Sequence, residues 1–330
     1  MFFQVLFHAL TSYNTWQTAL QFAALLVLPA LGGVISERSG VVNIAMEGMM
    51  LTGAFTAVMA TLLLHNAGVS ATLCVIFGVV AAILAGGLMA LIHGVISINF
   101  KANQIVSGVA INIFALGLTS YLVFVLTPAG QGVPSLPASL RLPTPSWGSL
   151  SNIPWLGNVL FQQNIIFYVA IPILIGVQFL LFRTNIGLRI RAVGEHPQAA
   201  DTAGVNVRLL RYVCVISSGL LSGLAGAYLS LGVAGVFNPN MTDGRGFIAL
   251  AAMIFGKYNP LGAAIACLIF GLGYGLSLPL QDLCSGSGSC NLSYLLQALP
   301  YVLVLLALVG LVGRTTPPAA DGIPYEPGSE

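Results

Sequence analysis

Polar side chains that could take part in chemistry stand inside long apolar segments of this sequence. Glu47 is the only acidic residue within one of these segments. A carboxylate at the centre of a membrane helix costs roughly 2.5–3.5 kcal/mol, so it normally faces a cavity or a partner. Two interpretations stay open: a residue of a transport pathway or gate, and a protonated or hydrogen-bonded carboxylate with structural value alone.

A second set of polar residues follows one helical face. Ser107 and Asn112 follow Gln104 by three and eight residues, which places them close to one side of a helix. The stripe favours the lining of a route for a hydroxyl-rich solute, although each side chain could equally form an interhelical contact worth about 0.6 kcal/mol. Asn43 is similar but could simply cap a helix. We predict a translocation path that comprises Asn43, Glu47, Asn103, Gln104, Ser107 and Asn112.

Sequence motifs of the common enzymes are missing. There is no Gly-x-x-x-x-Gly-Lys-Ser/Thr motif, because Gly256-Lys257 is followed by Tyr258 and lacks the upstream glycine. His-Glu-x-x-His and Gly-x-Ser-x-Gly are absent too, and the four histidines are far apart. We therefore predict no enzymatic activity, no cofactor and no metal. Energy for transport must come from another polypeptide or from an ion gradient.

The composition requires lipid as the main solvent. The 330 residues are 57% hydrophobic and 6% charged, whereas a soluble domain carries roughly 25% charged residues. The net charge of +2 comes with no basic stripe, so nucleic acid is not expected as a partner. Residues 1–37 contain no Lys or Arg, so the charged region of a cleavable signal peptide is missing. We expect the first apolar stretch to be retained as a membrane span.

The positions of the elements follow from apolar stretches of about 20 residues, the length that crosses a bilayer. The sequence predicts an all-α, polytopic helical bundle with about eight spans. They are residues 17–36, 41–64, 72–98, 104–126, 164–182, 212–236, 260–280 and 294–313. The shorter apolar piece from Gly246 to Gly256 predicts a half-helix, because it ends at a Gly and Pro break.

The distribution of cations predicts the orientation. Counting the half-helix as a crossing puts nine Lys and Arg residues on one side and only Arg141 and Arg245 on the other, which favours the first side as the cytoplasm. Residues 17–313 form the transmembrane domain, with an external loop at 127–163 and a cytoplasmic loop at 183–211. Residues 1–16 form an external interfacial segment, and 314–330 a disordered cytoplasmic tail. Cys284 and Cys290 lie outside, as a disulfide or as two free thiols.

The cytoplasmic loop contains the features of a short docking helix. Pro197 fits a first helical position and Gly204 a position just past a helix end. Two helical turns are marginal in water unless they dock onto something, and a separate cytoplasmic protein is the natural receiver. A plain surface loop with positive charges is the alternative.

The same loop resembles the coupling segment of permeases from the branched-chain amino acid, ribose and nucleoside group of ABC importers. Its typical pattern is Arg-Ala-x-Gly-Glu-Asn-x-x-Ala-Ala-x-x-x-Gly-Ile, from which His196 and Val205 depart. The matching residues are Arg191, Ala192, Gly194, Glu195, Ala199, Ala200 and Gly204. The stretch from Ser36 to Met50 is similar to the nucleoside and simple-sugar members. Further matches run from Ala102 to Asn112 and from Gly244 to Gly256.

This resemblance implies a fold like that of type II ABC importers and the partners of such a permease. Coupling to an ATP-binding cassette subunit would involve Arg191, Gly194, Glu195, His196, Pro197, Ala199, Ala200 and Gly204. It further implies a second permease subunit in a heterodimer, an external substrate-binding protein on residues 127–163, and the bacterial inner membrane. The solute would be a nucleoside first, a simple sugar second and a branched-chain amino acid third. An ion-gradient-driven secondary transporter that uses Glu47 for protons is the alternative.

Overall fold

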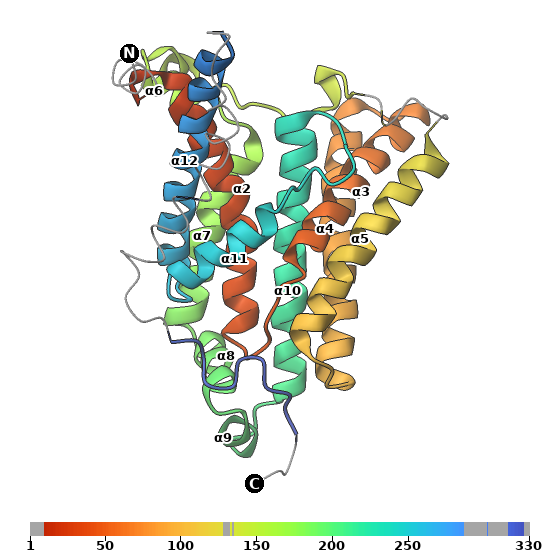
Figure 1. Cartoon of the computed structure of the whole chain (residues 1–330), viewed down its shortest axis with the longest axis vertical. Coiled ribbons are helices and arrows are strands. Elements are labelled where there is room, and N and C mark those ends of the chain that lie inside the picture. The colour runs from red at the N-terminus through yellow and green to blue at the C-terminus, as the bar shows by residue number, and fades with distance from the viewer. Residues whose placement is uncertain (1–9, 128–132, 134, 287–301, 303–315, 327–330) are drawn as a thin grey trace.

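The computed structural model describes residues 10–127, 133, 135–286, 302 and 316–326. Seven of its helices are long and apolar enough to cross a membrane, and they form an elongated bundle (Figure 1). They begin with α2 (Tyr13–Glu37), α3 (Met46–Asn66), α4 (Ala71–Gly94) and α5 (Gln104–Leu126). They continue with α7 (Ile165–Arg183), α10 (Val207–Ala227) and α12 (Pro260–Gly286). Seven predicted spans therefore match helices, and the eighth, 294–313, lies outside the described residues apart from Val302.

Three helices form the inside of the bundle and two lie at its periphery. The most apolar windows of α2 and α10 are 83% and 72% buried, and that of α3 is 67% buried. The corresponding windows of α5 and α7 are only 22% and 17% buried. An apolar helix that stays exposed in a single chain is expected to face lipid or another subunit.

Small residues let α10 approach its neighbours at backbone distance. A Cβ atom on Gly223 would overlap the carbonyl oxygen of Ala82 in α4, and one on Gly226 would overlap that of Met50 in α3. Such stripes are typical of membrane helices, whose association depends on close van der Waals packing. The glycines of this span therefore serve close helix packing.

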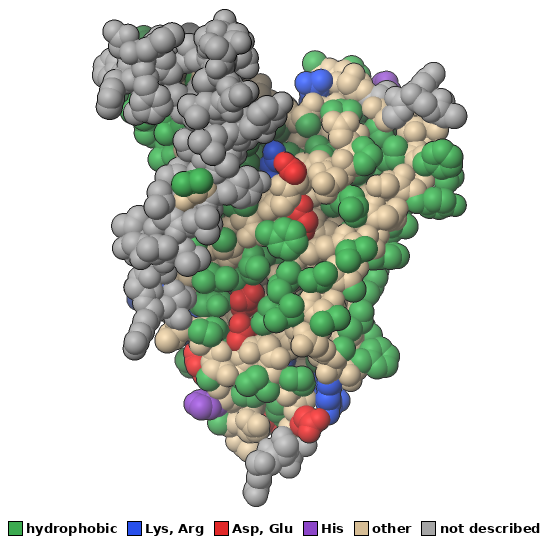
Figure 2. Space-filling view, viewed as in Figure 1, with side chains coloured by type: hydrophobic (Ala, Val, Ile, Leu, Met, Phe, Trp, Pro, Cys, Tyr) green, Lys and Arg blue, Asp and Glu red, His purple; other side chains and the backbone are tan. Residues whose placement is uncertain are grey.

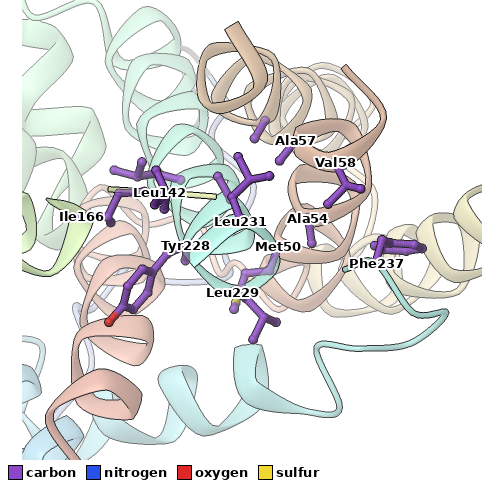
Figure 3. Close-up of a cluster of buried hydrophobic side chains, with 14 of the residues drawn as sticks. Met50, Ala54, Ala57, Val58, Leu142, Ile166, Tyr228, Leu229, Leu231 and Phe237 are labelled. Atoms are coloured by element: carbon purple, nitrogen blue, oxygen red, sulfur yellow. The ribbon is translucent and has the colours of Figure 1, made fainter. Parts of the chain in front are cut away.

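A buried cluster of hydrophobic side chains joins α3 to the end of α10. After Ala227 the helix continues as a π-helix, Tyr228–Ala234. Figure 3 shows Met50, Ala54 and Val58 facing Leu229 and Leu231 in this cluster. Two backbone hydrogen bonds, Leu142 N to Leu231 O and Leu136 N to Gly235 O, attach residues 135–164 to the same end. That segment contains two 3₁₀ turns, Ala138–Leu140 and Gly148–Asn152, and the short helix α6, Leu156–Leu160.

The predicted half-helix is present as α11, Arg245–Phe255. It ends at Gly256, and Lys257 and Tyr258 adopt left-handed backbone angles, with φ of 56° and 53°, before α12 starts at Pro260. A helix of 11 residues is about 16 Å long, half the thickness of a bilayer core. Its ends must therefore find hydrogen-bond partners inside the protein.

Two short helices project at the end of the bundle farthest from the N-terminus (Figure 1). They are α8, Asn185–Glu195, and α9, Pro197–Thr202. Residues 316–326 lie against them, with Ala320 and Tyr325 buried. The sequence predicts a disordered tail from 314 onward, whereas residues 316–326 make these contacts. The tail has little apolar content of its own, and the surface that it binds is formed by distant segments, so local sequence does not reveal the contacts.

Candidate functional site

The candidate coupling unit consists of α8 and α9. The hydroxyl of Thr184 accepts a hydrogen bond from Gly187 N at 3.1 Å and so caps the start of α8. Pro197 occupies the first turn of α9 as predicted, and Gly204 follows the helix with a φ of +83°. His196 stands at the N-cap without a side-chain hydrogen bond to the helix, which agrees with the weak capping ability of this residue type.

The coupling unit has a free outer face and a tied inner face. A shallow hollow of about 370 Å³ lies on the outer face. Its lining comprises Leu188, Arg189, Ala192, Glu195, His196, Ala199, Ala200, Ala203 and Val205. This face offers a largely apolar surface with a carboxylate and an imidazole, which is a surface suited to another protein.

The inner face of the unit is fixed to the bundle. Gly194 is buried, and a Cβ atom there would overlap the carbonyl oxygen of Arg38. The guanidinium of Arg191 lies 5.1 Å from the centroid of the Phe182 ring, a cation–π distance. Of the predicted coupling residues, Glu195, His196 and Ala199 are exposed, whereas Gly194 and Pro197 are buried against the rest of the protein.

The predicted path residues converge on the irregular segment that joins α2 to α3, residues 38–45, which we call the linker. Gln104 Oε1 accepts from Val42 N at 2.7 Å. Asn112 Oδ1 accepts from Gly48 N at 2.8 Å, and its Nδ2 donates to Ile44 O at 3.0 Å. Asn43 Nδ2 donates to Ser218 Oγ at 2.8 Å. These side chains supply partners for backbone groups that no regular helix satisfies, which is a requirement at membrane depth.

His93, which the sequence analysis does not single out, belongs to the same network. One ring nitrogen lies 3.0 Å from Val42 O and the other 3.0 Å from Ser107 Oγ. Asn103 has a different task, since its Oδ1 accepts from Ile105 N and Val106 N and caps α5. Asn43, Gln104 and Ser107 are buried. Their contacts are hydrogen bonds within the bundle, which is the alternative to the lining of a solute route that the polar stripe left open.

Glu47 binds the N-terminus of the half-helix. Its Oε1 accepts from Gly244 N at 2.8 Å and its Oε2 from Gly246 N at 2.6 Å. A helix leaves its first amides without internal partners and carries partial positive charge there, so a carboxylate is well matched to this place. The side chain is almost entirely buried, and its cost of burial is offset by these two charge-assisted bonds.

A second hollow, of about 360 Å³, opens beside Glu47. It brings Glu47 and Asn112 together with Asn240, Asp243 and Phe247, three residues that the sequence analysis did not single out. Asp243 and Phe247 are exposed. Figure 2 shows that hydrophobic side chains cover much of this face of the molecule, with a few acidic groups among them. The hollow combines carboxylate and amide groups with an aromatic ring, which can bind a solute that has hydroxyl groups and a flat ring.

The predicted pair Cys284 and Cys290 lies outside the described side chains, so the disulfide stays a prediction. Among the described cysteines, Cys74, Cys214 and Cys267 are free and buried, as expected for packing residues.

Comparisons with known proteins identify the family of this chain. Residues 16–309 match the family described as branched-chain amino acid transport system permease component. The guanosine ABC transporter permease protein NupQ of Bacillus subtilis is 44% identical over 314 residues, which cover 93% of this chain and 94% of NupQ. TsgC13 of Haloferax volcanii, named for glucose, is 37% identical over 265 residues, 80% of this chain and 77% of TsgC13. A second guanosine permease protein of B. subtilis, NupP, is 28% identical over 265 residues, 78% of this chain and 72% of NupP.

Proposed function

This chain belongs to the family of branched-chain amino acid transport system permease components and is a multi-pass membrane permease of an ABC importer, and from this premise we propose that it moves a nucleoside into the cell. The identity of 44% with a permease named for guanosine, over 93% of the chain, is the observation that carries the substrate class. A simple sugar is the second candidate, because a relative named for glucose is 37% identical.

The source of energy is an ATP-binding cassette subunit that docks on the outer face of α8 and α9. The exposed residues Glu195, His196 and Ala199 and the hollow around them support this place. A six-residue helix is too short to be stable alone, yet here it is held outward at the end of the bundle (Figure 1). An ion-gradient transporter has no use for such a helix, and Glu47, its proposed proton carrier, is engaged in holding α11.

A second permease subunit completes the transport path. The hollow at Glu47, Asn112, Asp243 and Phe247 is open on one side, and α5 beside it exposes large apolar side chains, among them Ile113 and Phe114. The existence of two guanosine permease proteins in B. subtilis, both similar to this chain, favours a partner of similar but not identical sequence. The predicted external loop, residues 127–163, is the segment that we propose receives an external substrate-binding protein.

The membrane that contains the chain, and the orientation of the chain in it, are part of the same proposal. We assign the chain to the bacterial inner membrane, with the N-terminus outside and the α8–α9 end and C-terminus in the cytoplasm. In a variant with Ser at 284 and 290, single cysteines at Ala138 and Gln198, both exposed, should react with an impermeant maleimide from opposite faces. Reaction from the same face would refute this orientation.

The test of the function is reconstitution of the permease with its partner permease and a cassette subunit from the same operon. Proteoliposomes that contain all three, supplied with the binding protein, should take up labelled guanosine only when ATP reaches the cassette. The double variant Glu195→Arg with Ala199→Arg should abolish both cassette capture and uptake, because a bulky cation replaces the acidic and small groups of the docking face. The control Ala138→Arg with Ser139→Arg, at exposed positions of the opposite end, should leave cassette capture intact. Uptake of glucose but not guanosine would move the assignment to a sugar, and uptake without a cassette would refute an ABC importer.

A further inference from the structure

The last described segment of the chain crosses the end of the bundle between the coupling unit and the linker. Residues 316–326 run from the side of α8 toward the lower end of α10 (Figure 1). A tight turn shapes the segment, with Asp321 N donating to Pro318 O at 3.1 Å and Ile323 N donating to Ala320 O at 3.2 Å. Gly322 allows this turn with a φ of +76°.

On one side the tail binds the coupling unit. Ala320 N donates to Gly194 O at 2.9 Å, and Ala319 N donates to Glu195 Oε2 at 3.2 Å. The carbonyl groups in the last turn of a helix lack internal partners, so the tail satisfies one at the end of α8. The ring of Tyr325 is buried in a cluster with Val193 of α8, Ala200 of α9 and Val207 of α10.

On the other side the tail binds the transmembrane body through Arg211. This side chain of α10 is only 2% exposed. Its Nη1 donates to Ile323 O at 3.0 Å, and its Nε donates to Ser39 O in the linker at 3.2 Å. One guanidinium therefore holds the tail and the linker together. Gly40 makes room for this contact, because a Cβ atom there would lie 2.8 Å from Arg211 Nη2 and 3.0 Å from Ala320 O.

The tail does not cover the outer face of the coupling unit. His196 and Ala199 stay exposed with the tail in place, so the segment does not compete with a protein docked there. Its contacts instead join three parts at once: α8 with α9, the linker, and the start of α10. An ion pair between Lys101 and Glu326 at the surface adds a fourth attachment, of the modest strength that exposed pairs have.

We propose that residues 316–326 act as a brace that fastens the coupling unit to the linker, so that movement imposed on α9 by the cassette reaches the transmembrane helices rather than being absorbed locally. The inference rests on the proposed docking of a cassette on α9. It assigns a role in transmission to a segment that does not bind solute and that meets the docking face only at its edge, at Glu195 and Ala200.

The test compares full-length permease with a variant that ends at Arg314 and with Tyr325→Ala, each purified with its partner permease and cassette and reconstituted with the binding protein. The measured quantities are cassette retained, ATP hydrolysed and guanosine transported per ATP. Ile323→Ala is the matched control, because this side chain is exposed and only its carbonyl contacts Arg211. The brace predicts normal cassette retention in every variant.

Transport per ATP should fall by roughly fivefold or more in the truncated protein, the lower end of typical couplings between two sites. Tyr325→Ala should fall in the same direction and Ile323→Ala should match the full-length protein. An unchanged ratio in the truncated protein, a higher transport rate, or loss of the cassette would each overturn the brace. Failure of the full-length protein to retain a cassette would refute the proposed function and the brace with it, so the two failures are told apart by the unaltered chain.

Discussion

Replacing Glu47 tests whether this carboxylate holds the half-helix in place. Its two oxygens accept hydrogen bonds of 2.8 and 2.6 Å from Gly244 N and Gly246 N. In Glu47→Gln one oxygen becomes an amide NH₂ group, so one of the two backbone amides loses its acceptor and meets another donor instead. A hydrogen bond to a charged group contributes about 1.5–3 kcal/mol, and Glu47→Gln is expected to destabilise the fold by that amount.

The assay is thermal unfolding of the purified permease in detergent, with guanosine uptake measured in parallel. At roughly 2 °C per kcal/mol for a chain of this size, the midpoint of Glu47→Gln should fall by about 3–6 °C. Asp243→Asn is the control, because it removes the same charge from an exposed carboxylate at the same hollow and should shift the midpoint by less than about 1 °C. Equal midpoints for Glu47→Gln and the unaltered protein would refute the capping role. If uptake were lost at the same time, Glu47 would belong to the path instead.

Two further predictions concern packing and the tail. Gly223→Ala should destabilise the chain by about 1–3 kcal/mol, because its new Cβ would overlap the Ala82 carbonyl oxygen. In the control Gly117→Ala the new Cβ meets nothing within 4 Å, so this variant should stabilise α5 slightly. Size-exclusion profiles after heating distinguish the two variants. Burial raises the pKa of Asp321 to about 7, from an ordinary value near 4 in a free tail. The docked tail therefore binds the proton of Asp321 more tightly than the free tail does. Docking should be strongest below about pH 4 and weaken as the pH rises to about 7. A spin label at residue 323, in protein without other reactive cysteines, should become more mobile as the pH rises over this range. Asp321→Asn should remove this pH dependence of the mobility. A mobility that falls with rising pH would contradict the reasoning. The charged or titratable groups that face Asp321 are Arg211, Glu37 and Tyr258.

Local signals in the sequence predict the elements well. The break after Gly256 predicts the half-helix, and Pro197 and Gly204 frame the coupling helix, because proline and glycine restrict or release the backbone at their own positions. The spans follow from apolar length alone. The caps and breaks depend on residues within about one helical turn, and the spans on a continuous stretch of about 20 residues. Both signals are local in the sequence, and the structure agrees with them within a few residues.

The partners of the polar residues could not be predicted in this way. The acceptor for Gly244 N is 197 positions away in Glu47, and the donor to Gln104 Oε1 is 62 positions away in Val42. A lone Gln or Asn in an apolar span looks the same whether it lines a cavity or satisfies a backbone group. One signal was available: the residues between the first two spans are too irregular for a helix, so their amides and carbonyls must have partners at membrane depth.

The contacts of the linker give the half-helix an unusual attachment. Glu47, just after the linker, holds the N-terminal amides of α11, while Arg38 at its beginning donates from Nε to Tyr258 O at 2.8 Å in the turn that follows α11. A single stretch of ten residues therefore contacts both ends of the half-helix that borders the hollow at Glu47. Gly194 of the coupling unit abuts the same Arg38, and the tail reaches the linker through Arg211. These contacts are close backbone approaches and hydrogen bonds rather than flexible surface pairs. A displacement of α8 and α9 therefore cannot leave the linker in place without breaking several of them, and α11 is the element that a shifted linker must carry with it.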